Sequence, residues 1–108
     1  MRYVLTIAIC MSIVNVYAGD AVTTISRLGA ATEQYAMMIV DVGLPTKPTC
    51  AEENNILSFD KSTPHGQDMF ALALSALTAN KQLMISYSET SCGLWGSRTL
   101  VNRIDILK

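Results

Sequence analysis

The sequence predicts a small α+β domain that is mostly β, with about five short strands, one helix and one disulfide. Three observations predict this fold class. Apolar and β-branched residues alternate in short stretches, which is the pattern of half-buried strands. One longer stretch, residues 64–79, has instead the 3.6-residue spacing of an amphipathic helix. Two cysteines, Cys50 and Cys92, follow a segment typical of exported proteins.

Residues 1–18 have the features of a cleavable signal peptide. Arg2 supplies a positive charge near the start, residues 3–14 are mostly apolar, and Val16 and Ala18 place small residues before a cleavage site. The apolar run is shorter than the roughly 20 residues that cross a bilayer. We therefore expect cleavage after Ala18 and a secreted or periplasmic bacterial protein, with no membrane association after cleavage. An uncleaved anchor is the alternative.

The remaining chain, residues 19–108, has the length of one small domain. A domain of this size buries a modest fraction of its surface and gains from a covalent link. In an oxidising compartment Cys50 and Cys92 are expected to pair as a disulfide, which contributes about 4 kcal/mol for a loop of this length. Two free thiols are the alternative. With His65 as the one histidine and no Cys-x-x-Cys motif, we expect neither a metal site nor a cofactor.

The charge distribution excludes a class of partner. The formal net charge is −1, and the lysines and arginines are scattered along the chain. Nucleic-acid binding needs a basic patch or stripe, because most of its affinity comes from neutralised phosphates. We therefore expect no nucleic-acid partner.

Strand patterns occupy most of the first half of the domain. Residues 20–27 alternate and are rich in β-branched side chains. Residues 34–42 are the most apolar run and predict a central strand. Residues 43–49 carry two prolines and predict a loop, and residues 56–59 predict a further short strand.

The helix has recognisable ends. Thr63 is a suitable N-cap, and Pro64 is well placed at the first helical position. Asn80 stands where a left-handed residue ends a helix. The apolar stripe comprises Met69, Phe70, Ala73, Leu74, Ala76 and Leu77.

Two more strands are predicted after the helix, over residues 82–88 and 99–106, with a turn at residues 93–96 between them. Two or three strands, a helix and two strands suit a small Greek-key barrel of the OB type. A plain α+β sandwich has the same order of elements and is the alternative.

The stretch FALALSALTANKQLMISYSETSC, together with the later VNRIDI, resembles a group of short secreted bacterial proteins of unknown function. It is similar, more distantly, to the B subunits of pertussis-like and subtilase-like AB toxins. The likeness covers residues 70–106, and Asn80 replaces the glycine of that pattern. It implies an OB fold, a ring of about five subunits and binding of a glycan.

Catalysis is not expected. A hydrolase needs a nucleophile, a base and an orienting group, and His65 has no identifiable serine partner. Glu52 and Glu53 adjoin Cys50 and are interpreted as solvated loop charges, with an acid/base pair or a calcium site as the alternative.

Aromatic residues with polar neighbours are the better candidates for binding, because sugar rings stack on aromatic faces. Trp95 lies in a glycine-bracketed turn and either covers one end of a barrel or contacts a ligand or subunit. Arg98 follows it and is a candidate fork for a carboxylate. Tyr35, Tyr87 and Ser86 lie on predicted strands.

Two functions from different classes remain. The first is a non-catalytic binding module, with the B-subunit-like homo-oligomer recognising a glycan or a protein as its most specific form. The second is a monomeric periplasmic structural or inhibitor-type protein. An enzyme is the least expected.

Overall fold

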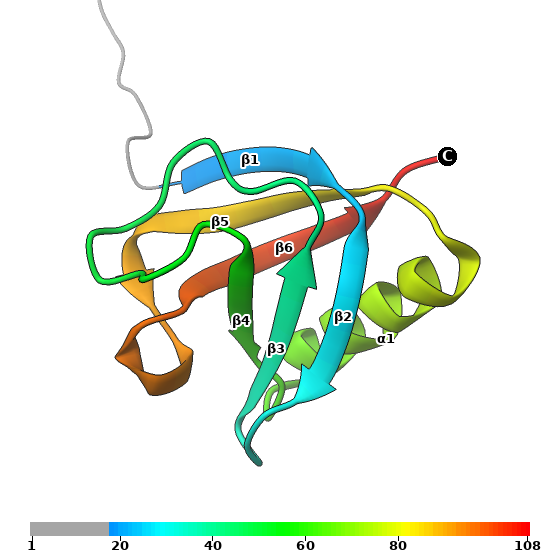
Figure 1. Ribbon diagram of the computed structural model, residues 1–108. Helices are drawn as coiled ribbons and strands as arrows, with labels where there is room; N and C mark the ends of the chain where they lie inside the picture. The colour runs from blue at the N-terminus through cyan, green and yellow to red at the C-terminus, as the bar shows by residue number, and fades with distance from the viewer. Residues whose placement is uncertain (1–17) are drawn as a thin grey trace, which may run out of the picture.

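The computed structural model of this chain describes residues 18–108 (Figure 1). Of the predicted signal peptide only Ala18 belongs to this range, so that prediction lies outside the described residues. The elements in order are β1 (Ala18–Thr23), β2 (Ile25–Ala30), β3 (Tyr35–Val40), β4 (Ile56–Asp60), α1 (Pro64–Ala79), β5 (Leu83–Cys92), the 3₁₀ turn η1 (Leu94–Gly96) and β6 (Thr99–Ile106).

The strands form one six-stranded mixed sheet in the order β1-β5-β6-β4-β3-β2. Strands β4 and β6 are parallel, and the other neighbours are antiparallel. The predicted α+β, mostly β class is therefore confirmed. The hydrogen-bonded order begins at β1 and ends at β2, so within residues 18–108 the ladders make an open sheet, and the closed barrel that the sequence suggested is not found.

Residues 18–108 contain six strands where about five were expected, because the first predicted strand is divided at Thr24. Its first half, β1, pairs with β5, whereas its second half, β2, pairs with β3. The backbone carbonyl of Thr24 accepts from the N–H of Asp41 at 2.9 Å, and its hydroxyl donates to the Asp41 carboxylate. The buried Thr23 hydroxyl accepts from the Val42 N–H at 3.0 Å. These bonds hold the bend visible between β1 and β2 (Figure 1).

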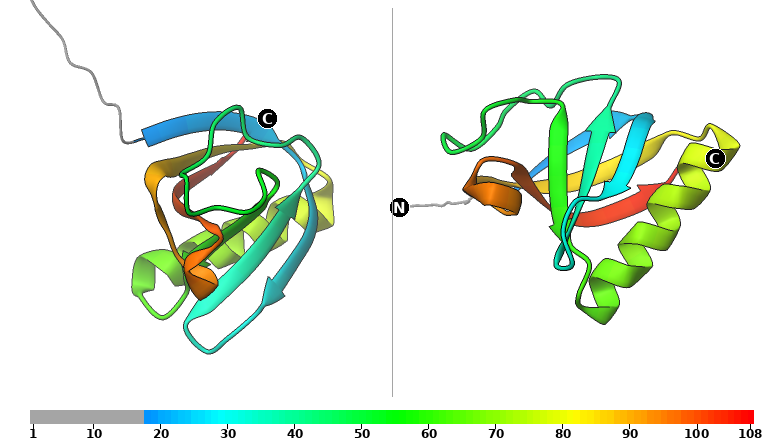
Figure 2. Two further views of the ribbon diagram at one scale, coloured as in Figure 1. Left: turned by 60° about the vertical axis from the view of Figure 1, so that its left-hand side comes forward. Right: turned by 60° about the horizontal axis from the view of Figure 1, so that its bottom comes forward.

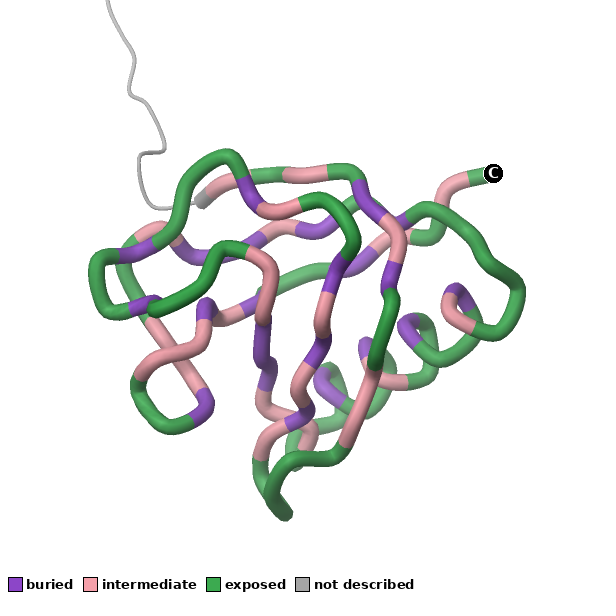
Figure 3. Tube along the Cα trace, viewed as in Figure 1, coloured by how far each residue is buried: buried purple, intermediate pink, exposed green. Residues whose placement is uncertain are grey.

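The core lies between the curved sheet and α1, which contacts β2 and β6 (Figure 2). Along β3 every second residue is buried, so the period of two predicted from the sequence is realised. The helix buries Met69, Ala73 and Ala76, and the Phe59 and Phe70 rings meet with centroids 6.4 Å apart. Figure 3 shows the buried residues of α1 on the side that faces the sheet.

Both helix ends follow the prediction. The Thr63 hydroxyl accepts from the Gly66 N–H at 3.0 Å, and Pro64 begins the helix. Asn80 ends it in the left-handed conformation, with φ 56° and ψ 49°. Gly66 is required for close approach, because a Cβ there would lie 1.7 Å from the Asp60 carbonyl oxygen.

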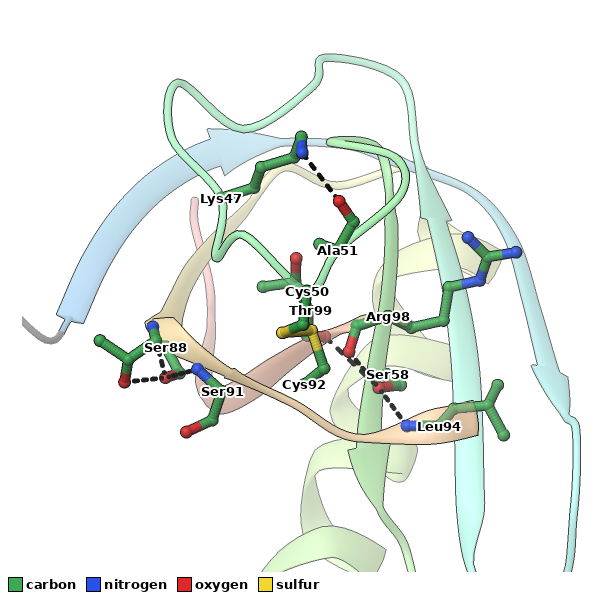
Figure 4. The surroundings of a disulfide bond; sticks show 11 residues. Lys47, Cys50, Ala51, Ser58, Ser88, Ser91, Cys92, Leu94, Arg98 and Thr99 are labelled. Atoms are coloured by element: carbon green, nitrogen blue, oxygen red, sulfur yellow. Dashed lines mark hydrogen bonds between the residues drawn. A yellow bond between two sulfur atoms is a disulfide. The ribbon is translucent and has the colours of Figure 1, made fainter. Parts of the chain in front are cut away.

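The predicted disulfide between Cys50 and Cys92 is present (Figure 4). It joins the loop of residues 41–55 to the end of β5, which runs past the predicted 82–88 up to Cys92 itself. A disulfide is consistent with an oxidising compartment outside the cytoplasm. Among residues 18–108, no helix has the length and apolar character needed to cross a membrane.

Candidate binding site

The candidate site is built on the turn of residues 93–98, which follows the disulfide directly. Gly93 donates to the Arg98 carbonyl at 2.8 Å, which closes the turn. Leu94 is buried, and its N–H donates to the Ser58 hydroxyl at 3.1 Å. That hydroxyl lies 3.3 Å from the Arg98 carbonyl oxygen, to which it donates (Figure 4). Ser58 on β4 therefore holds both ends of the turn in place.

Trp95 is presented to solvent by this turn. Its exposed fraction is 64%, so it does not cover the end of the sheet, which was one of the two interpretations of this residue. Its backbone is in the left-handed region, with φ 57° and ψ 10°. A bulky residue rarely adopts this conformation, which costs of the order of 1–3 kcal/mol. Trp95, the largest side chain of the turn, is thus exposed to solvent, and its own backbone is strained.

Arg98 lies beside Trp95. Its guanidinium carbon is 5.7 Å from the centroid of the indole ring, within the range of a cation–π contact. The Arg98 side chain is only 16% exposed, and its Nε is buried without a hydrogen-bond partner. Leaving such a donor unsatisfied costs about 1–3 kcal/mol. Because Nε makes no hydrogen bond and Nη1 makes one long contact, the Arg98 side chain is positioned mainly by packing.

Glu52 supplies the counterion of Arg98 from the neighbouring loop. Its Oε1 lies 3.4 Å from Arg98 Nη1, and its own side chain is 67% exposed. The Glu52 backbone N–H donates to the Ser97 carbonyl at 3.1 Å, which places the loop beside the turn. We call the group formed by Glu52, Trp95 and Arg98 the Trp95 corner.

An open pocket adjoins the Trp95 corner at Glu52. It has a volume of about 330 Å³. Its walls come from one loop, which is held by the buried side chains of Leu44 and Pro48 and by a 2.7 Å bond from Lys47 Nζ to the Ala51 carbonyl. The lining residues are Leu44, Pro45, Thr46, Lys47, Glu52, Glu53 and Asn54.

Tyr35, a second predicted site residue, lies near the same turn. It begins β3 and is half-buried, and β3 contacts η1. Its Cε1 lies 2.9 Å from the position that a Cβ on Gly93 would occupy. The structure therefore brings Trp95 and Arg98 together and places Tyr35 beside Gly93 in the same turn.

The other two predicted residues lie elsewhere. Tyr87 is completely buried, and its hydroxyl is hydrogen-bonded to the Thr46 hydroxyl at 2.8 Å, so its ring belongs to the core. Ser86 donates to the Asp20 carboxylate at 2.6 Å across the β1–β5 ladder. Neither side chain is part of the Trp95 corner.

The histidine that the sequence singled out, His65, has a structural partner. His65 Nε2 donates to the Asn102 carbonyl at 2.8 Å, which ties the start of α1 to β6. Within the described residues no three His, Cys, Asp or Glu side chains gather in a way that suits a metal ion. The pKa of Asp60 is lowered by hydrogen bonds, first from the Ser62 hydroxyl, then from Gln34 and the Ser62 N–H. These bonds order the connection from β4 to α1.

Sequence reasoning missed two contributors to the site. Ser58 was part of a strand pattern, and nothing local shows that its hydroxyl holds a turn 36 residues further along the chain. Glu52 has the sequence context of a solvated charge, and its contact with Arg98 joins two segments that are far apart in the chain. The position of Glu52 beside Cys50 was the available signal.

Comparison with known proteins gives no family assignment, because neither a protein-family model nor a curated protein sequence matches this chain.

Proposed function

We propose that this protein is a non-catalytic binding module, exported from a bacterial cell, that contacts its partner through the Trp95 corner. The single observation that carries the proposal is the state of Trp95, which is 64% exposed and held in a left-handed backbone conformation by a rigid turn. Strained residues of this kind concentrate at functional sites. Contact with a partner would cover the exposed indole, and such burial is favourable.

The surroundings of Trp95 support a role in recognition. Tryptophan and arginine are the residue types most enriched among those that dominate binding energy. The disulfide, Ser58 and the buried Leu94 fix the turn before any ligand arrives. A preformed site binds with less loss of conformational entropy. A glycan, stacked on the indole, is the partner that the sequence resemblance implies.

An OB-like arrangement is our interpretation of the sheet. The two outer strands, β1 and β2, are the two halves of one bent segment, separated by Thr24 alone. The sheet therefore starts and ends at the same place in the chain. A helix between β4 and β5 and the parallel β4–β6 pair also support this interpretation. OB folds are five-stranded and partly open, and counting β1 and β2 as one strand gives that number.

The function is tested by screening the labelled, disulfide-bonded protein against an array of defined glycans. We expect binding to a restricted set of glycans, reduced more than about tenfold by Trp95→Ala, as for a central aromatic anchor. The matched control is Leu74→Ala, which removes another exposed apolar side chain, from α1, and is expected to leave binding unchanged. Equal losses in both variants would contradict a role for the Trp95 corner.

The B-subunit-like form of the proposal requires a homo-oligomer, and light scattering after size exclusion tests it. A mass near five subunits supports a multivalent ring. A monomer at tens of micromolar rejects the ring and favours the alternative function, a monomeric inhibitor-type or structural protein. The disulfide next to the exposed turn favours that alternative, because a rigid projecting loop suits insertion into a partner protein.

A further inference from the structure

The guanidinium of Arg98 makes fewer hydrogen bonds than a charged group with so little exposure usually makes. Within the described residues, the one hydrogen bond of its side chain goes to Glu52, at 3.4 Å. Charge-assisted bonds of this type are usually about 2.7–2.9 Å long. Nε has no hydrogen-bond partner, although only 16% of the side chain is exposed. The structure thus holds a nearly buried positive charge that is only weakly compensated.

Glu52 is poorly suited to be a permanent counterion. Its side chain is 67% exposed, and it contacts Arg98 through one oxygen. An ion pair whose carboxylate is this exposed contributes little, because water competes for the carboxylate oxygens. A guanidinium prefers two parallel bonds to one carboxylate, and Glu52 provides one long bond. A carboxylate from outside can therefore displace Glu52 at small cost.

A ligand held by Arg98 also meets Trp95. The guanidinium carbon lies 5.7 Å from the indole centroid, and the indole is largely exposed. An apolar or C–H-rich surface attached to the bound carboxylate would lie against the negative face of the ring. Beyond Glu52 the open pocket of about 330 Å³ gives room for the rest of the molecule.

We propose that the Trp95 corner binds a carboxylate-bearing ligand, whose carboxylate takes the terminal nitrogens of Arg98 in place of Glu52 while its adjoining surface packs on Trp95. This inference rests on the proposed binding function and names the ligand chemistry for the same site. An acidic sugar and a free chain-terminal carboxylate share this chemistry. The experiment separates them.

Trp95 is the only tryptophan in the chain, so fluorescence excited at the indole band reports on this site alone. The disulfide-bonded protein is titrated with three probes: methyl β-D-glucuronoside, its neutral match methyl β-D-glucoside, and N-acetylglycine. We expect a saturable change with the two carboxylates and none with the glucoside at the same concentrations. Tighter binding of the glucuronoside identifies an acidic sugar as the source, and tighter binding of N-acetylglycine identifies a chain terminus.

Two substitutions test the assigned roles of the side chains. Glu52→Gln removes the competing carboxylate and is expected to lower the apparent Kd for the glucuronoside about threefold. Arg98→Gln is expected to raise it more than about tenfold. The matched control is Arg103→Gln, which removes an exposed arginine that is paired with Asp105 on the same strand, β6. It is expected to leave the Kd unchanged.

The results that overturn the inference differ from those that overturn the proposed function. Equal responses to the glucuronoside and the glucoside, or weaker binding in Glu52→Gln, reject the displaced carboxylate but leave Trp95 as a binding platform. The same rejection follows if none of the probes binds and the array shows Trp95-dependent binding to neutral glycans. Absence of any Trp95-dependent binding, on the array or to the probes, rejects both. Because Glu52→Gln changes an exposed side chain, its result does not depend on whether Arg98→Gln folds.

Discussion

At the scale of single residues, two glycines differ in how much space their surroundings leave for a side chain. Gly66 lies in the first turn of α1, where a Cβ would be 1.7 Å from the Asp60 carbonyl oxygen. Gly29 lies on β2, where a Cβ would have no atom within 4 Å. Neither has a positive φ, so the backbone conformation strains an alanine at neither position.

We predict that Gly66→Ala lowers the free energy of unfolding by about 3 kcal/mol, because the helix must move away from β4 to make room. The matched control, Gly29→Ala, is expected to change it by less than about 0.5 kcal/mol. Urea unfolding followed by circular dichroism measures both. Similar stabilities of the two variants would show that the contact between Gly66 and Asp60 is not close.

At the scale of elements, α1 is the part of the fold whose ends follow from local chemistry. Its N-cap, Thr63, accepts a hydrogen bond from Gly66, and its C-terminal Asn80 takes the left-handed conformation. Between them, the small residues Ala73 and Ala76 are buried. Local propensity and tertiary packing therefore favour the same helix, which is why its limits were predictable.

We predict that Thr63→Ala destabilises the protein by about 1 kcal/mol, because the Gly66 N–H loses its acceptor. The control is the same substitution in the same helix at Thr78, an exposed position. There alanine has the higher helix propensity, so the stability is expected to stay equal or to rise by a few tenths of a kcal/mol. Thermal and urea unfolding measure both variants. A loss at Thr78 as large as that at Thr63 would argue against a specific capping bond.

At the scale of the whole molecule, the disulfide connects the two segments that form the Trp95 corner. Cys50 lies two residues before Glu52, and Cys92 lies three residues before Trp95. The link spans 42 residues in sequence, so it also limits the unfolded chain. Stability and site geometry therefore depend on the same bond.

We predict that replacing both cysteines by serine lowers the free energy of unfolding by about 4 kcal/mol in the chain-entropy treatment. Hydrogen exchange should show a second effect. The Glu52 N–H, which donates to the Ser97 carbonyl, should exchange much faster relative to amides in β3 than it does in the disulfide-bonded protein. An unchanged ratio would mean that the loop is held without the disulfide.

Local sequence patterns were sufficient to predict the class of the fold, most of the element limits and the disulfide. Periods of 2 and 3.6, capping residues and the pair of cysteines that follows the predicted signal peptide are local signals, and they need no knowledge of distant contacts. It also identified Trp95 and Arg98 as candidates, because an aromatic and a basic residue in a glycine-bracketed turn are visible in the chain itself.

Which of the candidate residues lie close together depends on the tertiary structure. Tyr87 and Tyr35 have similar strand patterns in the sequence, yet Tyr87 is completely buried and Tyr35 lies beside the turn. The bend at Thr24, which divides one predicted strand between two partners, depends on bonds to Asp41 and Val42. The pairing of Glu52 with Arg98 likewise depends on segments far apart in the chain. Such contacts are set by how the sheet folds over the core, and no local pattern of residues encodes them.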